Sequence, residues 1–163
     1  MDNNPFKLLN TKKTMEEDQK ERDESLIKGA DPYEDERGKI NNFHLPQPIN
    51  LLATITSKKG SVRANHYHPI QQQMCLVISG SYISVYKDLT VPNSPMKHQL
   101  VKSGDLSVMP PMVAHTMIFL EDTTFLNLVG GNRDHDKFSQ HTIKFELVKQ
   151  EEIQSYISKY LMQ

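Results

Sequence analysis

The sequence predicts an all-β protein of one domain, built as a small barrel or a sandwich. The length of 163 residues fits one domain, since domains commonly hold about 100–200 residues. From Lys39 onward, short β-rich runs alternate with glycine and proline turn signals, which favours a barrel or sandwich over βαβ units. The run from Tyr82 to Tyr86 alternates with period two, as a half-buried strand should.

The predicted strands are short, and each ends at a recognisable turn signal. The expected strand ranges are 39–45, 51–57, 61–66, 74–79, 82–87, 98–101, 106–109, 115–120, 124–129 and 142–148. The turn signals include Gly38, Gly60, Gly80, Gly104, Pro110-Pro111 and Gly130-Gly131.

Both ends of the chain differ from this pattern. Residues 1–34 are expected to form a polar, charged arm. Residues 11–28 have almost no apolar stripe, which predicts a frayed helix or disorder rather than a dimer-clasping arm. The barrel is expected over 35–148. The sequence predicts an amphipathic helix over residues 149–163, which would dock on the barrel or on a second subunit. Its apolar residues at helical spacing are Ile153, Tyr156, Ile157, Tyr160 and Leu161.

Composition excludes several function classes. The net charge of −1, from 19 basic and 20 acidic residues, gives no field that favours nucleic acid or an anionic membrane. No run approaches the roughly 18 apolar residues of a membrane span, and the N-terminus does not resemble a signal peptide. A single cysteine, Cys75, excludes an intrachain disulfide and indicates a reducing compartment, so a cytoplasmic location is expected.

The most informative residues are three histidines. His66 and His68 are two apart on a predicted strand, so their side chains point to the same side. His115 follows Pro110-Pro111 at the start of an apolar strand. A facial cluster of this kind can hold a divalent metal with open positions, or it can supply a general base near neutral pH.

At these residues the sequence resembles the cupin superfamily over about 37–148. The resemblance implies a double-stranded β-helix, or jelly-roll barrel. The residues that match the first motif are Gly60, His66, His68, Gln73 and Gly80, and those that match the second are Gly104, Pro110 and His115. By this match the metal ligands would be His66, His68, Gln73 and His115. Gln73 stands where the motif has glutamate, and Met112 where it has a glycine; a neutral amide is a weaker ligand than a carboxylate, and the alternative is a metal-free pocket.

Two further runs narrow the resemblance to nucleotide-sugar cupins. The run from Arg63 to His68 is similar to the Arg-Gly-x-His segment of deoxysugar 3,5-epimerases, dTDP-sugar 3,4-ketoisomerases and the cupin domain of capsule UDP-sugar epimerase/reductases, with Ala64 in place of glycine. The run from Asp35 to Gly38 resembles their Asp-x-Arg-Gly turn. The resemblance therefore implies an epimerase or ketoisomerase for a 4-keto-6-deoxy nucleotide sugar, and a homodimer.

The same resemblance implies roles for individual residues. His66 would be the base that removes a proton beside the ketone, and His68 would assist it or ligate a metal. Substrate binding is expected from Arg63, Arg37, Tyr82 and Tyr86, the guanidinium groups gripping diphosphate or sugar oxygens and one of the tyrosines serving as the acid. One divalent ion (Zn, Fe, Ni or Mn) is expected, or none if the site is of the ketoisomerase type.

Two alternatives stay open. A mononuclear metal cupin such as an iron or nickel dioxygenase would use the same three histidines, and tight iron binding would favour it. A sugar- or ligand-binding cupin without activity is the other alternative, for which Gln73 is the main hint. The remaining histidines match no ligand pattern and are expected at the surface: His44, His98, His135 and His141.

Overall fold

The structure, a computed structural model, describes residues 25–27, 29–130 and 138–162. Residues 1–24 of the arm predicted over 1–34 lie outside the described residues, and so does His135. Within the described ranges, no helix is both long and apolar enough to cross a lipid bilayer.

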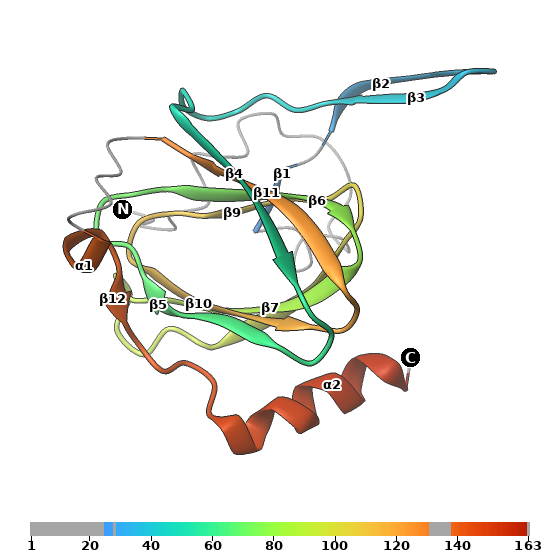
Figure 1. The fold of residues 1–163 in the computed structure, drawn as a ribbon. Helices are drawn as coiled ribbons and strands as arrows, with labels where there is room; N and C mark the ends of the chain where they lie inside the picture. Colours follow the sequence, from blue (N-terminus) through green and yellow to red (C-terminus); the bar gives the residue numbers. More distant parts are fainter. Residues whose placement is uncertain (1–24, 28, 131–137, 163) are drawn as a thin grey trace.

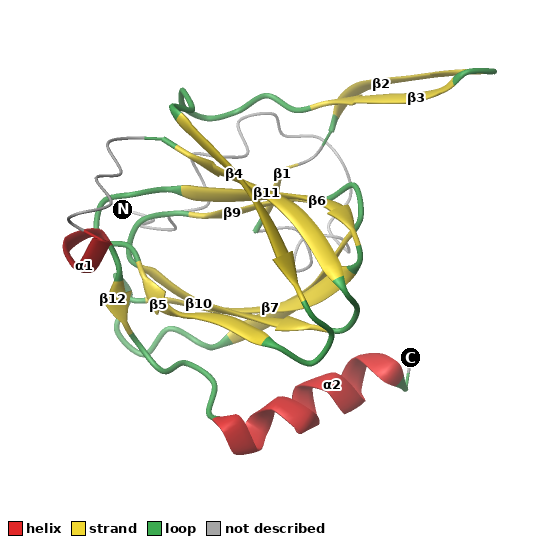
Figure 2. Ribbon diagram, in the orientation of Figure 1, coloured by secondary structure: helices red, strands yellow, loops and turns green. Residues whose placement is uncertain are grey.

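Two antiparallel sheets of five strands each face one another (Figures 1 and 2). Sheet 1 contains, in spatial order, β1 (Leu26–Ile27), β9 (Leu106–Met109), β6 (Gln73–Ser79), β11 (Thr123–Val129) and β4 (Leu51–Ser57). Sheet 2 contains β12 (Ile143–Lys144), β5 (Val62–Tyr67), β10 (Val113–Phe119), β7 (Ser81–Asp88) and β8 (Lys97–Lys102). The chain alternates between the sheets from β4 to β7 and from β8 to β12, so the predicted jelly-roll barrel is confirmed.

Strand β7 shows how alternation builds the two sides of sheet 2. Tyr82 points into the barrel, where it packs against Phe119 and Phe125. Ile83 and Val85 point the other way and belong to a separate apolar cluster on the outer face of the sheet. The period-two pattern in the sequence is therefore the pattern of burial on the two faces.

The outer cluster is covered by the C-terminal helix. Helix α2 (Ile153–Leu161) follows a short 3₁₀ turn, η4 (Gln150–Glu152), and lies along the outer face of sheet 2 (Figure 1). Ile153 and Tyr156 are the buried residues of α2 and pack in the same cluster as Ile83. The predicted amphipathic helix is confirmed, and it docks on its own barrel.

Residues 25–27 belong to the barrel, although the composition of the sequence groups them with the polar arm. Strand β1 pairs with β9, and the Ser25 hydroxyl, fully buried, donates a 2.7 Å hydrogen bond to the Gln99 amide oxygen on β8. Because β9 lies in sheet 1 and β8 in sheet 2, this bond joins the two sheets along one side of the barrel.

A two-stranded hairpin of β2 (Ala30–Asp35) and β3 (Gly38–Asn42) stands away from the barrel (Figure 1). Tyr33 and Ile40 are partners across it and are 54% and 55% exposed. An isolated hairpin of two strands has little stability of its own in water, so the exposed apolar pair suits a contact surface.

The strand predicted over 142–148 is shorter in the structure. Within that range only Ile143 and Lys144, which form β12, pair with β5, and the chain then leaves the sheet. The next backbone amides bond to Asn65 instead: Phe145 donates to its carbonyl, and Leu147 and Val148 donate to its side-chain oxygen. For Leu147 and Val148, the Asn65 side chain accepts the hydrogen bonds that a neighbouring strand would otherwise accept. Alternation in the sequence alone does not reveal this.

Candidate active site

The structure brings the three predicted histidines together inside one end of the barrel. His66 lies on β5, His68 directly follows that strand, and His115 lies on β10 as the cross-strand partner of His66. The ring centre of His66 is 4.7 Å from that of His68 and 4.8 Å from that of His115. One ring nitrogen from each lies within 4.8 Å of the others, so all three can contact one atom.

Backbone carbonyls fix the tautomers of two of these rings. His68 Nδ1 is 2.9 Å from the carbonyl oxygen of His141, and His115 Nδ1 is 3.1 Å from that of Val113. Since a carbonyl only accepts, Nδ1 carries the proton in the neutral form of each ring. Nε2 is then the atom that can take a proton or a metal.

Gln73 and Asn127 extend this network. The Gln73 amide oxygen lies 3.0 Å from His68 Nε2, and the Gln73 amide nitrogen donates to the Asn127 side-chain oxygen at 2.9 Å. This orientation suits protonated His68, which donates from Nε2; turning both amides over would suit neutral His68. A glutamate in place of Gln73 would only accept, so the glutamine lets His68 keep a hydrogen bond in either state.

His115 has a pKa far below that of an ordinary histidine. Burial, and after it the charges of His66 and His68, lower the pKa of His115 to about 3. His115 is thus neutral near pH 7 and offers its ring as an acceptor or ligand, not as an acid.

The donor set fits a divalent metal ion. His68 and His115 each bond through Nδ1 to a backbone carbonyl, the arrangement that orients metal-binding histidines. The amide oxygen of Gln73 adds a fourth donor without adding negative charge. A bound ion would supply Lewis-acid stabilisation of negative charge on a substrate oxygen.

The two predicted tyrosines occupy different parts of the barrel. Tyr86 is the β7 partner of His115 and is 2% exposed, so it lies beside the histidines. Tyr82 lies four residues away along the strand, about 13 Å at the usual rise. Its hydroxyl bonds to the Ser107 hydroxyl at 2.8 Å, and burial raises its pKa well above the usual value. Of these two tyrosines, Tyr86 therefore adjoins the histidines.

Neither predicted arginine is bonded to the histidines. Arg63 reaches from β5 to β4, where Nε donates to the Ser57 hydroxyl at 2.6 Å and an η nitrogen donates to the Thr56 carbonyl at 2.8 Å. Arg37 lies at the tip of the β2–β3 hairpin, where its exposed guanidinium forms a 2.6 Å ion pair with Asp35. That pairing lowers the pKa of the Asp35 carboxyl. Arg63 joins the sheets, and Arg37 stands clear of its own barrel.

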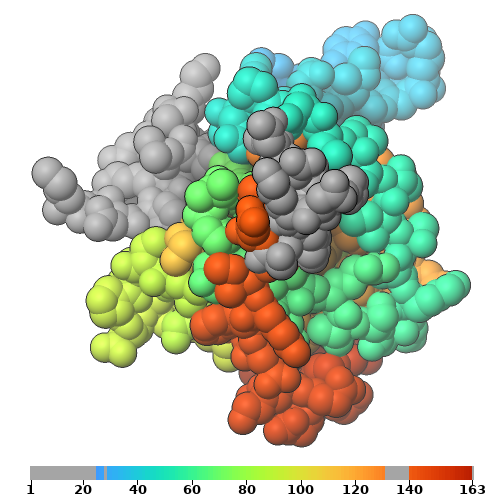
Figure 3. Space-filling view, turned by 60° about the vertical axis from the view of Figure 1, so that its left-hand side comes forward, coloured from blue at the N-terminus to red at the C-terminus, as the bar shows by residue number. Residues whose placement is uncertain are grey.

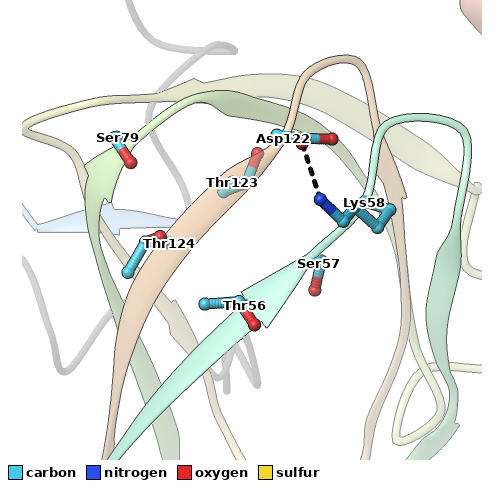
Figure 4. A pocket seen from close by; sticks show the side chains of 7 residues that line it. All are labelled: Thr56, Ser57, Lys58, Ser79, Asp122, Thr123 and Thr124. Atoms are coloured by element: carbon cyan, nitrogen blue, oxygen red, sulfur yellow. Dashed lines mark hydrogen bonds and ion pairs between the residues drawn. The ribbon is translucent and has the colours of Figure 1, made fainter.

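A shallow polar pocket lies at the other end of the barrel (Figure 4). Its described lining residues are Thr56, Ser57, Lys58, Ser79, Asp122, Thr123 and Thr124. Lys58 and Asp122 form a 3.0 Å ion pair across its rim. This pocket is separate from the histidine cluster, because it surrounds the start of β11, which follows the far end of β10, whereas His115 lies near the start of β10.

Sequence reasoning gave no role to Asn127, to the Asn65 side chain or to His141. Asn127 is 1% exposed on β11, between the apolar residues Leu126 and Leu128. A polar residue in the middle of an apolar strand was the feature of the sequence that could have indicated a role for Asn127. His141 ends α1 (Phe138–His141) and serves the site through its backbone carbonyl, which no sequence pattern marks.

Solved structures of similar shape include 3,4-ketoisomerases and a dTDP-4-dehydrorhamnose 3,5-epimerase. The TDP-quinovose 3,4-ketoisomerase of Campylobacter jejuni superposes with a TM-score of 0.61 and 16% identity, over 78% of this chain and 94% of that one. A 3,4-ketoisomerase from Thermoanaerobacterium thermosaccharolyticum, a double mutant in complex with TDP, gives 0.56 and 22%, over 85% and 96%. The chain has a cupin fold.

The same fold is found in the dTDP-4-dehydrorhamnose 3,5-epimerase of Sulfolobus tokodaii, with a TM-score of 0.55 and 21% identity over 70% of this chain and 72% of that one. No protein-family model and no curated protein sequence matches this chain. At these identities the likeness concerns the fold, and function must be argued from the site.

Proposed function

We propose that this cupin is a nucleotide-sugar epimerase or 3,4-ketoisomerase that moves a proton beside the ketone of a 4-keto-6-deoxy sugar. The observation that carries the proposal is the packing of His66, His68 and His115 at ring distances of 4.7–5.5 Å inside the barrel. The ketone acidifies its neighbouring C–H bonds, and the half-buried imidazole of His66 is a suitable base for them. The similarity in shape to epimerases and ketoisomerases supports the same proposed function.

In the proposed mechanism His66 takes the proton. His68 assists it, held by Gln73, whose amide can accept or donate as the charge on His68 changes. Tyr86 is the candidate for the acid that returns a proton, since it adjoins His115. The neutral His115 ring places no positive charge beside His66, which would otherwise lower the basicity of the base.

The substrate-binding arginines remain part of the proposal. Arg63 lies on the same strand as His66, and a diphosphate that displaced Ser57 from its guanidinium would gain a bidentate partner. Arg37 stands on the projecting hairpin, so we propose that it contacts the substrate of a second copy in a homodimer. The exposed Tyr33 and Ile40 on that hairpin suit such a contact.

The decisive experiment measures solvent deuterium entering dTDP-4-keto-6-deoxyglucose, by NMR or mass spectrometry. His66→Asn is expected to abolish the exchange because the base is lost. His44→Asn is the matched control, since His44 is exposed and on the segment after β3. Exchange at the wild-type rate in His66→Asn would contradict the role of His66.

A second candidate is a metal-dependent oxygenase, favoured by the three histidine nitrogens that lie within 4.8 Å of one another, with the Gln73 amide oxygen 3.0 Å from His68 Nε2. Elemental analysis of protein purified without chelator or a metal-binding tag separates the two. About one equivalent of iron or nickel favours oxygenase chemistry, whereas zinc, or no metal with exchange present, favours the sugar enzyme.

A further inference from the structure

The pairing of β5 with β10 contains one extra residue immediately before the histidines. His115 and Met117 are two apart on β10, yet their partners His66 and Arg63 are three apart on β5. The register shifts between Thr116, which faces Ala64, and His115. Strand β5 therefore has a β-bulge, and Asn65 is the residue without a partner in the ladder.

This bulge decides which face the histidines occupy. Adding one residue to a strand reverses the facing of every side chain that follows. His66 and His68 accordingly point into the barrel, while Tyr67 between them packs with Phe145 in the cluster outside sheet 2. In a regular strand continuing from Arg63, Tyr67 would point inward and both histidines outward.

The backbone of the bulge is strained. Ala64 has φ of 70° and Asn65 has φ of 52°, a left-handed conformation that costs an alanine roughly 1 kcal/mol or more and that asparagine tolerates better. Two consecutive residues of this kind need surrounding contacts to persist.

The Asn65 side chain supplies those contacts with nearly all of its hydrogen-bonding capacity. Its oxygen accepts from the Thr116 hydroxyl at 2.5 Å and from the backbone amides of Leu147 and Val148, both at 3.1 Å. Its amide nitrogen donates to the Val148 carbonyl at 3.0 Å. Thr116 and Val148 are 0% and 1% exposed, so the clamp is shielded from water.

The clamp joins the histidine strands to the C-terminal part of the chain. Thr116 directly follows His115 and Asn65 directly precedes His66, so one side chain ties β5 to β10 beside the histidines. Leu147 and Val148 are anchored in turn in the cluster under α2. Figure 3 shows this part of the chain, orange to red, running down the face of the molecule to its base.

We propose that Asn65 is a positioning residue: its side chain clamps the β5 bulge to Thr116 and to the C-terminal segment, and this turns His66 and His68 into the barrel. The consequence for turnover rests on the proposed function. The consequence for the direction of the rings does not.

The test compares three variants. Asn65→Gly keeps the left-handed backbone but removes every side-chain bond, and Asn65→Asp keeps the three accepted bonds. Asn93→Gly is the matched control, because Asn93 also has a positive φ, 57°, in an exposed turn. The readouts are the NOE between the His66 and His115 rings in isotope-labelled protein, and kcat and KM for deuterium exchange.

Asn65→Gly is expected to lose the NOE and about 100-fold in kcat, with KM close to wild type, since a misplaced base fails in the reaction step. Asn65→Asp should restore the NOE and most of kcat, and Asn93→Gly should match the wild type. An unchanged NOE in folded Asn65→Gly overturns the proposal. If the wild type shows no exchange, the proposed function has failed while the NOE still decides the role of Asn65.

If Asn65→Gly does not fold, Thr116→Val takes its place, because it removes the hydroxyl donor at nearly constant volume. A weakened NOE and a roughly tenfold lower kcat are expected, in line with one lost hydrogen bond of about 1.4 kcal/mol. An NOE and a rate equal to those of the wild type would overturn the proposal.

Discussion

The two ends of strand β10 lie in opposite kinds of interior. At one end Phe119 packs with Tyr82 and Phe125, with ring centres 5.6–6.4 Å apart, and the ladder to β7 is regular. At the other end His115 meets His66 across a bulge, and buried polar groups are held by hydrogen bonds. The aromatic end gains stability from apolar burial. The histidine end needs a partner for each buried polar group, and it tolerates backbone strain because the rest of the barrel is well packed.

The largest expected effect comes from breaking the aromatic end. Phe119→Ala should lower the free energy of unfolding by about 3–5 kcal/mol, since Phe119 is fully buried and its loss leaves a cavity. Urea unfolding followed by circular dichroism measures this. Leu52→Ala, at a position 60% exposed, is the control and should change stability little. Equal effects at both positions would contradict the division into two ends.

The next effect is the pH dependence created at the histidine end. The pKa of His115 is about 3 in the folded protein, against an ordinary value of 6.5, so below pH 6.5 the unfolded chain binds a proton that the folded protein does not. Stability should therefore fall on acidification, by about 2 kcal/mol between pH 7 and pH 5. The measurement is urea unfolding of chelator-treated protein at both pH values, compared with His115→Gln. The same pH dependence in that variant would show that other groups are responsible.

The smallest effect concerns the strain in the bulge. Ala64→Gly should stabilise the protein by up to about 1 kcal/mol, because glycine adopts the positive φ of this position without steric cost. The same substitution at Ala53, in the regular strand β4, should destabilise it by a similar amount. Melting temperatures of the two variants should therefore move in opposite directions. A loss of stability in Ala64→Gly would mean that packing of the alanine methyl group stabilises the protein by more than the backbone strain destabilises it.

Local patterns in the sequence were sufficient for much of the barrel. The strands at 51–57 and 106–109 have the predicted limits, and the helix near Ile153 lies where its spacing indicated. Alternation and helical spacing depend on near neighbours in the chain, so they can be read without knowing the fold. That His66 and His68 point to the same side of their strand was predictable for the same reason.

Tertiary structure decided what depends on pairing between distant strands. The sequence offered Tyr82 and Tyr86 equally, and only the register of β7 against β10 sets Tyr86 beside His115. The predicted strand over 142–148 ends early because Asn65, about 80 residues away in the chain, takes its backbone bonds.

By itself, then, the sequence determined an all-β fold with a helix at the C-terminus, and it identified three histidines as the candidate site. Alternation in the sequence did not determine that Asn65 forms a bulge, and the inward direction of His66 and His68 was expected only from the resemblance to cupins. Alternation specifies that two side chains share a face, whereas which face they share depends on register, and register is fixed by contacts with the rest of the folded chain.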